Sequence, residues 1–244
     1  MSIIPFGAGE VIGDAPDRRV EILSDHPALN ATWSRFSAGR DGADLHIHRK
    51  HTDMFYVIEG ELTVRLGPAG EEVVVPAGTL ARVPPMVVHG FRNGSDAEMR
   101  YLNFHAPGMD FANYLRAMRD GREYSYDQFE PPADGGRPIT EAVVGGAEHL
   151  GDGVTLHADI EAIGAAERRS AAPEAEHVHE SEVESFYVLE GELALTVGGD
   201  EVSAAAGTWV QVPAGVPHAV SLSDDVRFLH VRTPNGRLAA ALRA

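Results

Sequence analysis

Cysteine is absent from this chain of 244 residues, which excludes disulfide bonds and thiolate metal ligands. A chain without cysteine suits a reducing compartment, and we expect a cytoplasmic protein. No apolar run reaches the length of about 18 residues that a membrane helix needs. The first residues, from Met1 to Pro5, have no basic segment followed by an apolar one, so we expect no signal peptide.

Basic residues are also scarce. The 20 Lys and Arg residues face 37 Asp and Glu residues, which gives a formal net charge of -17. Because phosphate neutralisation requires clustered Lys and Arg, we expect no nucleic-acid partner. The acidic excess is typical of a soluble protein. A hydrophobic content of 43% is sufficient for a core in each of two domains.

The chain contains one pattern of residues twice. The first block of the pattern is a His-x-His pair, a carboxylate and a glycine, found as His46, His48, Asp53 and Gly60, and again as His177, His179, Glu184 and Gly191. The second block is a glycine, a proline and a third histidine, found as Gly78, Pro84 and His89, and again as Gly207, Pro213 and His218. The copies are 131 residues apart in the first block and 129 in the second. Such faithful spacing indicates an internal repeat, and hence two similar domains.

Short strand-like runs separated by turn residues predict an all-β barrel or sandwich in each copy. Examples are residues 19–23, 61–66 and 192–197. Turns of unequal length, at residues 67–70 and 198–200, explain the difference between the two offsets.

A short helix is predicted after each barrel. Phe111, Tyr114, Leu115 and Met118 lie on one helical face, with Asp110 as N-cap and Gly121 as the end. Leu238, Ala241 and Leu242 form a shorter stripe. The turn-rich segment at residues 131–138 predicts a domain boundary, with domains at residues 1–130 and 131–244.

The repeated residues have the chemistry of a metal site. Alternate residues of a strand share a face, so His46 and His48 project together from backbone positions about 6.6 Å apart. The same holds for His177 and His179. Three neutral imidazoles and one carboxylate suit a divalent Fe, Ni, Mn, Cu or Zn ion and leave coordination positions open. The sequence therefore predicts a divalent transition metal, with up to one ion in each barrel.

The two ligand sets differ in their carboxylate. Asp53 is about 1.5 Å shorter than the Glu184 of the second set. We therefore expect the backbone to shift, a water to bridge, or Asp53 to lie outside bonding distance, with lower metal occupancy in the first barrel. His51 is a spare donor nearby, which we interpret as a loop residue, although ligation by His51 in place of Asp53 stays open.

Strand parity also outlines a pocket beside each ligand set. The predicted inward residues are Phe55, Val57, Phe91, Asn93, Phe186, Val188, Val220 and Leu222. They are largely apolar, which suits an aromatic or other apolar small molecule, or simply the filling of a barrel. Arg82 and Gln211 occupy equivalent positions, as do Asn103 and His230, but parity does not fix which way these four side chains face.

The two blocks resemble the motifs of the cupin superfamily, and the chain resembles a bicupin. Three positions depart from the family pattern: Asp53 where Glu is expected, Met86 where Gly is expected, and Leu222 where Asn is expected. The resemblance implies two tandem cupin barrels, of the double-stranded β-helix or jelly-roll type, with metal bound by His46, His48, Asp53 and His89 and by His177, His179, Glu184 and His218.

Within that superfamily the chain resembles small bacterial cupins similar to quercetin 2,3-dioxygenase. This implies a metal-dependent dioxygenase for a small aromatic or enolisable substrate. Glu184 would be the catalytic base, and Asp53 its weaker counterpart. A non-oxidative isomerase or decarboxylase and a non-catalytic small-molecule-binding cupin are the alternatives. The partners to consider are a small-molecule substrate and a second copy of the chain in a homodimer.

Overall fold

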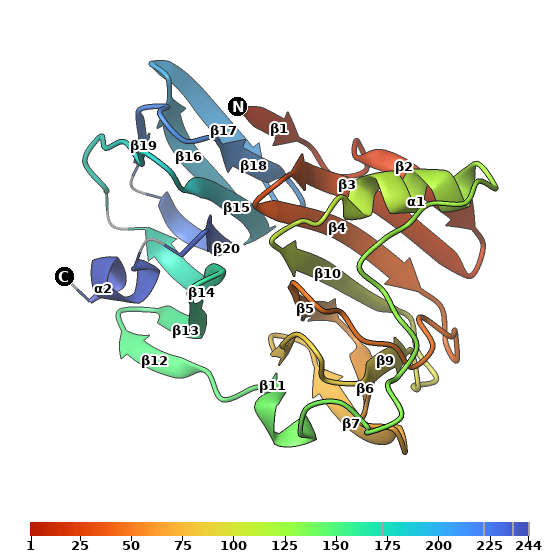
Figure 1. Cartoon of the computed structure of the whole chain (residues 1–244). Coiled ribbons are helices and arrows are strands. Elements are labelled where there is room, and N and C mark those ends of the chain that lie inside the picture. Colours follow the sequence, from red (N-terminus) through yellow and green to blue (C-terminus); the bar gives the residue numbers. More distant parts are fainter. Residues whose placement is uncertain (172, 222, 236, 244) are drawn as a thin grey trace. The chain divides into compact units, whose positions relative to one another are not determined.

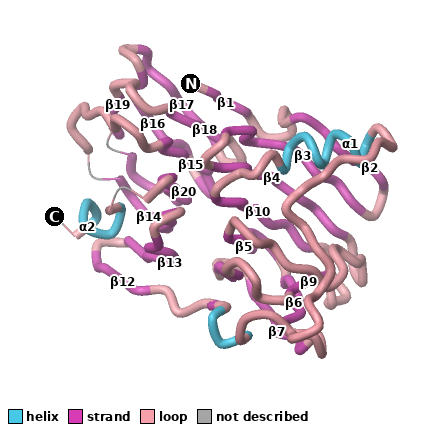
Figure 2. The backbone as a smooth tube through the Cα atoms, viewed as in Figure 1, coloured by secondary structure: helices cyan, strands magenta, loops and turns pink. Residues whose placement is uncertain are grey.

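The computed structural model describes residues 1–171, 173–221, 223–235 and 237–243 (Figure 1). The described chain divides into two compact units. We call residues 10–146 the first barrel, and residues 1–9 together with 147–244 the second barrel. Strands dominate both units, and Figure 2 shows only short helical segments among them. The predicted all-β class is confirmed.

The first barrel consists of a seven-stranded sheet and a three-stranded sheet. The larger sheet has the order β11-β8-β5-β10-β4-β3-β2, and the smaller one β7-β6-β9. The elements are β2 (Glu10–Ala15), β3 (Arg18–His26), β4 (Leu29–Phe36), β5 (Thr52–Glu59), β6 (Glu61–Leu66), β7 (Glu71–Pro76), β8 (Leu80–Val83), β9 (His89–Arg92), β10 (Met99–Ala106), α1 (Phe111–Arg119), a 3-10 turn (Ile139–Glu141) and β11 (Val143–Val144).

The second barrel repeats this architecture. Its larger sheet has the order β1-β18-β15-β20-β14-β13-β12, and its smaller sheet β17-β16-β19. The elements are β1 (Ser2–Ile4), β12 (Glu148–Gly151), β13 (Val154–Ile160), β14 (Ile163–Ala171), β15 (Val183–Glu190), β16 (Glu192–Val197), β17 (Asp200–Ala205), β18 (Trp209–Val212), β19 (His218–Val220), β20 (Ser223–Thr233) and α2 (Leu238–Leu242). The strand β1 comes from the start of the chain and pairs with β18.

The predicted helices form, although not with the expected cap. Helix α1 begins at Phe111 and ends two residues before Gly121. Asp110 precedes it in a left-handed conformation, and its side chain caps no backbone N–H group of the helix. Its carboxylate instead accepts a hydrogen bond from Asn113 Nδ2 at 2.8 Å. The predicted position of the N-cap is therefore confirmed, whereas side-chain capping is wrong.

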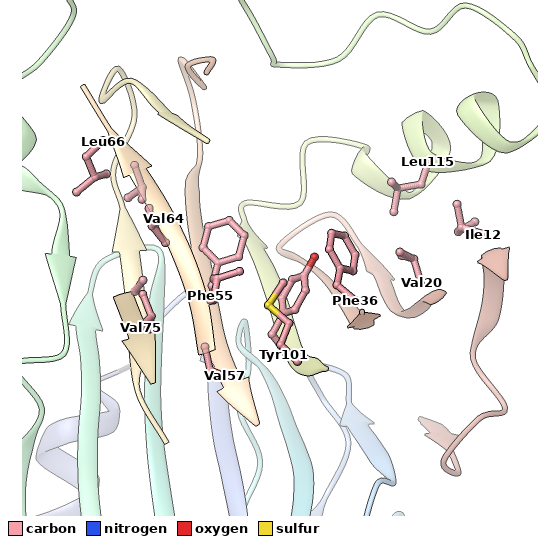
Figure 3. Packing of buried hydrophobic residues seen from close by; sticks show 14 of the residues in the cluster. Ile12, Val20, Phe36, Phe55, Val57, Val64, Leu66, Val75, Tyr101 and Leu115 are labelled. Atoms are coloured by element: carbon pink, nitrogen blue, oxygen red, sulfur yellow. The ribbon is translucent and has the colours of Figure 1, made fainter. Parts of the chain in front are cut away.

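The apolar face of α1 packs on the first barrel. The helix lies against β2 and β3, with Ala112, Leu115 and Ala117 buried. Figure 3 shows Leu115 near Ile12 and Val20, with the aromatic side chains of Phe36, Tyr101 and Phe55 to their left in the same cluster. Because every one of these side chains is withdrawn from water, the helix is held by the hydrophobic effect at one end of the barrel core.

In the second barrel, α2 contacts β13 and β14, where Leu238 and Ala239 are buried. None of the helices in the described part of the chain is both long and apolar enough to cross a bilayer.

Candidate metal centres

Backbone pairing brings the first and third histidine of each ligand set together. His46 and His89 exchange two backbone hydrogen bonds, of 2.8 and 2.9 Å, across an antiparallel bridge. His177 and His218 form the same bridge with bonds of 2.9 and 3.0 Å. Residues directly opposite each other in an antiparallel pair project to the same side. The third histidine is therefore placed by strand pairing across 43 residues of sequence in the first barrel.

The four predicted ligands of the first barrel converge. His46 Nε2 lies 3.2 Å from His48 Nε2. Asp53 Oδ2 lies 3.3 Å from His89 Nε2 and 3.7 Å from His48 Nε2. All four residues are buried, and their donor atoms lie within 4.8 Å of one another. The carboxylate of Asp53 thus lies among the three imidazoles, and lower metal occupancy in the first barrel stays a prediction.

The second nitrogen of each imidazole in the first set faces a backbone carbonyl oxygen. The distances from Nδ1 of His46, His48 and His89 are 2.7, 2.5 and 2.9 Å, to the carbonyls of Asp44, Asp127 and Val87. A carbonyl only accepts, so Nδ1 carries the proton and Nε2 keeps its lone pair for the shared centre. This arrangement fixes the tautomer that metal ligation requires.

The predicted ligands of the second barrel also converge. Glu184 Oε2 lies 3.6 Å from His177 Nε2 and 3.3 Å from His179 Nε2, and it contacts His218 Nε2. Two of the imidazoles are less buried than in the first barrel, since the side chains of His177 and His179 are 30% and 16% exposed. The second set is therefore assembled, but it is more open to water.

The carboxylate of the second set has competing partners. Glu184 Oε1 lies 2.5 Å from His230 Nε2 and 2.7 Å from the Arg232 guanidinium. Burial by itself raises the pKa of Glu184, but the imidazoles around it lower that pKa far below the usual value. The Glu184 carboxylate thus stays ionised and shares one oxygen with the Arg232 guanidinium.

Asp53 has a different environment. Asn103 Nδ2 donates to Asp53 Oδ1 at 2.5 Å, while Asp53 Oδ2 faces the imidazoles. Burial raises the pKa of Asp53, but the facing imidazoles of His105, His48 and His89 lower it well below its usual range. Burial also lowers the pKa of His46 to about 3, so this imidazole is neutral at pH 7 and available as a ligand.

A buried polar network continues from Asp53 away from the ligand centre. His105 Nε2 donates to Asn103 Oδ1 at 2.9 Å. Its other nitrogen lies 2.9 Å from His51 Nε2 and 2.8 Å from the Tyr126 hydroxyl, which donates to this imidazole pair. His51, His48 and His105 also have donor atoms within 4.8 Å of one another. His51 is a loop residue, as predicted, and it lies outside the four-ligand set.

Asp127 anchors the loop between the ligands and β5. Its carboxylate accepts the backbone N–H groups of Arg49 and Lys50, at 3.1 and 2.8 Å, and His51 Nδ1 at 2.9 Å. Its backbone carbonyl holds His48. In the described part of the second barrel the carboxylate nearest to His179 Nδ1 is Glu182, 3.9 Å away. The first ligand set is therefore braced by the segment after α1, and the second lacks this brace.

A cavity of about 220 Å³ opens onto the first ligand set. His46, His48 and Asp53 lie in its wall together with Asn103 and His105. The rest of the wall is mainly aromatic and apolar and includes Phe36, Phe91, Tyr101, Phe111, Tyr114 and Leu115. Phe111 stacks on His105 with ring centroids 3.9 Å apart. Helix α1 thus supplies one side of this cavity.

The cavity beside the second ligand set is about 350 Å³. It is lined by His177, His179, Glu174, His230, Arg232 and residues of α2. No aromatic carbocycle is among these residues.

The residues predicted from strand parity divide between cavity and core. Phe91 lines the first cavity, and Phe55 packs behind it with ring centroids 5.0 Å apart. Asn93 uses its amide to bind the carbonyls of Phe36, Ser37 and Ala97. The remaining described members lie in the two hydrophobic cores: Val57, Phe186, Val188 and Val220. Leu222 lies outside the described residues.

Several site residues have no counterpart in the predicted set: Arg18, His105, Tyr126, Asp127, Phe111 and Tyr114. In the sequence, Asn103 is marked only by its equivalence to His230 in the repeat. Each of these two residues contacts the carboxylate of its own ligand set. Their equivalence in the repeat could therefore have identified them as site residues.

Comparison with known proteins agrees with the repeat. The family model "Cupin domain" matches residues 32–105 and 169–232. Quercetin 2,3-dioxygenase of Bacillus subtilis (strain 168) is 22% identical over 229 residues, which cover 75% of this chain and 66% of that protein. The chain therefore spans slightly less than two thirds of that relative's length.

Solved structures share the fold at low identity. Protein Ylba from E. coli has a TM-score of 0.65 and 14% identity, covering 93% of this chain and 88% of its own. Oxalate decarboxylase from Bacillus subtilis, at pH 4.6, has a TM-score of 0.62 and 16% identity, covering 96% of this chain and 76% of its own. Another structure of that enzyme, which concerns its Mn(II) centres, has a TM-score of 0.64 and 15% identity, with 96% and 78% coverage.

Proposed function

The chain belongs to the cupin family, with two tandem cupin domains, and from this premise we propose that it is a metal-dependent oxygenase of small aromatic or enolisable substrates. The observation that carries the proposal is the convergence of three imidazoles and one carboxylate beside a mainly aromatic and apolar cavity, with His46, His48 and Asp53 in its wall. We place the reaction in the first barrel.

The donor set fits a transition metal. The Nε2 atoms of His46, His48 and His89 and the Oδ2 atom of Asp53 are buried, convergent and free of backbone partners. A bound transition metal supplies Lewis acidity and open coordination positions for substrate and dioxygen. Asp53 Oδ2 is the nearest acceptor for the proton of a substrate hydroxyl. Its low pKa makes it a weak base, so it suits a hydroxyl that is itself made acidic by coordination.

The cavity wall orients a ring and limits water. Phe91 and Phe36 have ring centroids 6.0 Å apart, and Phe111 and Tyr114 lie 5.9 Å apart on the side formed by α1. Faces and edges of these rings favour a flat aromatic substrate. The volume of about 220 Å³ is below the roughly 300–1,000 Å³ of pockets for drug-sized ligands. We therefore favour a substrate with one ring or an equally small enolisable group.

A non-oxidative isomerisation or decarboxylation is the second candidate. The observation in its favour is the network of His51, Tyr126 and His105, which reaches Asp53 through Asn103. Such a network can hold a proton near the substrate while a carbon–hydrogen or carbon–carbon bond is broken. Oxygen consumption distinguishes the two candidates.

The test combines metal analysis with oxygen uptake. Protein purified without a metal-affinity tag is analysed for its metals, and each metal-loaded form is assayed with catechols, flavonols and 1,3-diketones. The double variant His46→Ala/His48→Ala should lose oxygen uptake, and the matched variant His177→Ala/His179→Ala should retain it. Uptake that follows the second pair places the reaction in the second barrel. Product formation without oxygen uptake favours the non-oxidative candidate.

A further inference from the structure

Arg18 is a cation in the wall of the first cavity and has no counter-ion among the described residues. It is the first residue of β3 and lies in the same cavity wall as Ser34, Tyr101 and Tyr114. Its Nε atom is buried and has no hydrogen-bond partner among the described residues. Among the residues that the structure describes, its guanidinium makes no ion pair. The guanidinium carbon lies over the ring of Phe36, 5.6 Å from its centroid.

The nearby carboxylates are engaged elsewhere. Asp14 pairs with Arg19 at 2.7 Å, and Asp17 pairs with Arg40 at 3.2 Å. The chain has a net charge of -17, yet this arginine of the cavity wall has no acidic partner among the described residues. A partly desolvated cation that lacks a counter-ion costs free energy, which an anionic ligand would offset.

Arg18 and the ligand set lie at opposite ends of the cavity. On β4, Phe36 pairs with Arg18, whereas Thr32 pairs with Asn103, the residue that donates to Asp53. Thr32 and Phe36 are four residues apart on one strand, roughly 13 Å at the usual rise. A small molecule can therefore present one group to the ligand set and another to Arg18.

Hydroxyl groups surround the Arg18 end. Tyr101 lies between Phe36 and Phe55 in Figure 3, and Ser34 faces its hydroxyl. Burial raises the pKa of Tyr101 and of Tyr114, and the positive charge of Arg18 opposes that rise in both. The guanidinium and these neutral hydroxyls together offer donors to an anion.

We propose that Arg18 selects substrates that carry a carboxylate, and that the substrate class of the first barrel is a small hydroxylated aromatic or enolic acid. The carboxylate binds at Arg18, where guanidinium geometry allows two parallel hydrogen bonds, and the oxygen to be activated lies at the other end. This assignment deepens the proposed function and rests on it for the role of the ligand set.

The test compares an acid with its neutral counterpart. Binding of 3,4-dihydroxybenzoate and 3,4-dihydroxybenzamide is measured by calorimetry at pH 7, with the protein as purified and after removal of metal by a chelator. The acid should bind at least tenfold more tightly than the amide in both states. Arg18→Gln should weaken acid binding roughly ten- to a hundredfold and leave amide binding unchanged, because charge-assisted hydrogen bonds have this strength.

Two further variants separate recognition from folding. Arg18→Lys keeps the charge and should restore part of the preference for the acid. Arg100→Gln removes an exposed arginine of β10 that pairs with Glu59 and Glu98, and should change neither affinity. The melting temperature of Arg18→Gln should not fall, since the described part of the chain holds no acidic partner for Arg18. A lower melting temperature with unchanged acid preference would identify Arg18 as structural and overturn the proposal.

The remaining outcomes are also decisive. Equal affinity for acid and amide in the wild type, including binding of neither, overturns the proposal. If the acid binds more tightly than the amide only in the metal-loaded protein, the carboxylate of the acid binds at the ligand set. That result also overturns the proposal. A preference that depends on Arg18 without any oxygen uptake supports the acid class and argues against the oxygenase.

Discussion

Asp127 offers the sharpest test of how the first ligand set is held. We expect Asp127→Ala to lower both the stability of the first barrel and its affinity for metal. The carboxylate accepts three donors, the N–H groups of Arg49 and Lys50 and Nδ1 of His51. Each orphaned buried donor costs about 1–3 kcal/mol. Some will find water, so the free energy of unfolding should fall by roughly 3–5 kcal/mol. Asp127→Asn keeps one acceptor oxygen and should cost about 1–3 kcal/mol.

The effect on metal follows from His48. Its Nδ1 lies 2.5 Å from the backbone carbonyl of Asp127, which the carboxylate contacts keep in place. Loss of such an outer partner typically lowers metal affinity by about ten- to a hundredfold. Metal titration in a His177→Ala/His179→Ala background would report the first ligand set alone.

Stability can be followed barrel by barrel. The chain has two tryptophans, Trp33 on β4 and Trp209 on β18, so a Trp209→Phe background reports urea unfolding of the first barrel. The matched control is Asp134→Asn, an exposed residue of the same segment whose carboxylate accepts only the N–H of Gly136, at 3.1 Å, among the described contacts. An Asp127→Ala protein within about 0.5 kcal/mol of wild type, with unchanged metal affinity, would refute the reasoning.

Three further outcomes are expected. Asn103→Ala removes the donor to Asp53 and should weaken metal binding in the first barrel by about ten- to a hundredfold, as measured by titration. Met86 has a φ of 69°, so Met86→Gly should relieve left-handed strain and raise the free energy of unfolding by up to about 1 kcal/mol, whereas a loss would show that its side chain matters more. Burial lowers the pKa of His46 and of His51 to about 3, whereas the value in the unfolded chain is near 6.5. Between about pH 3 and pH 6.5 these two imidazoles therefore bind more protons in the unfolded state than in the folded state. The metal-free protein should therefore lose stability as pH falls from about 6.5 toward 3, by roughly 1.4 kcal/mol per pH unit for each such proton, and pH-independent melting would contradict this.

The sequence was sufficient to predict which histidines and carboxylates lie together, because the information is local and repeated. Strand alternation places His46 beside His48, and the two copies of the pattern confirm one another. The strands at residues 61–66 and 192–197 were predicted with their observed bounds for the same reason. Turn residues and apolar periodicity also predicted α1 and α2, since each depends on a few neighbouring residues.

The other features of the site depend on contacts between segments that are distant in the sequence. Asp127 supports His48 across 79 residues of sequence, and no local pattern marks it. The residues at positions 2–4 pair with β18, more than 200 residues away. The alternation of residues along a strand shows which side chains point inward, but not whether they line a cavity or fill the core. It therefore could not distinguish Phe91, which lines the cavity, from Val57, which lies in the core.

The difference between the two barrels is likewise a tertiary property. In the sequence, Glu184 appeared the better ligand and Asp53 the weaker, because only side-chain length was visible. In the folded chain both carboxylates direct one oxygen at the imidazoles of their set. The other oxygen of Glu184 contacts Arg232 and His230, whereas the other oxygen of Asp53 accepts from the Asn103 amide. Electrostatic partners come from strands distant in sequence, and their charges determine what each carboxylate can do.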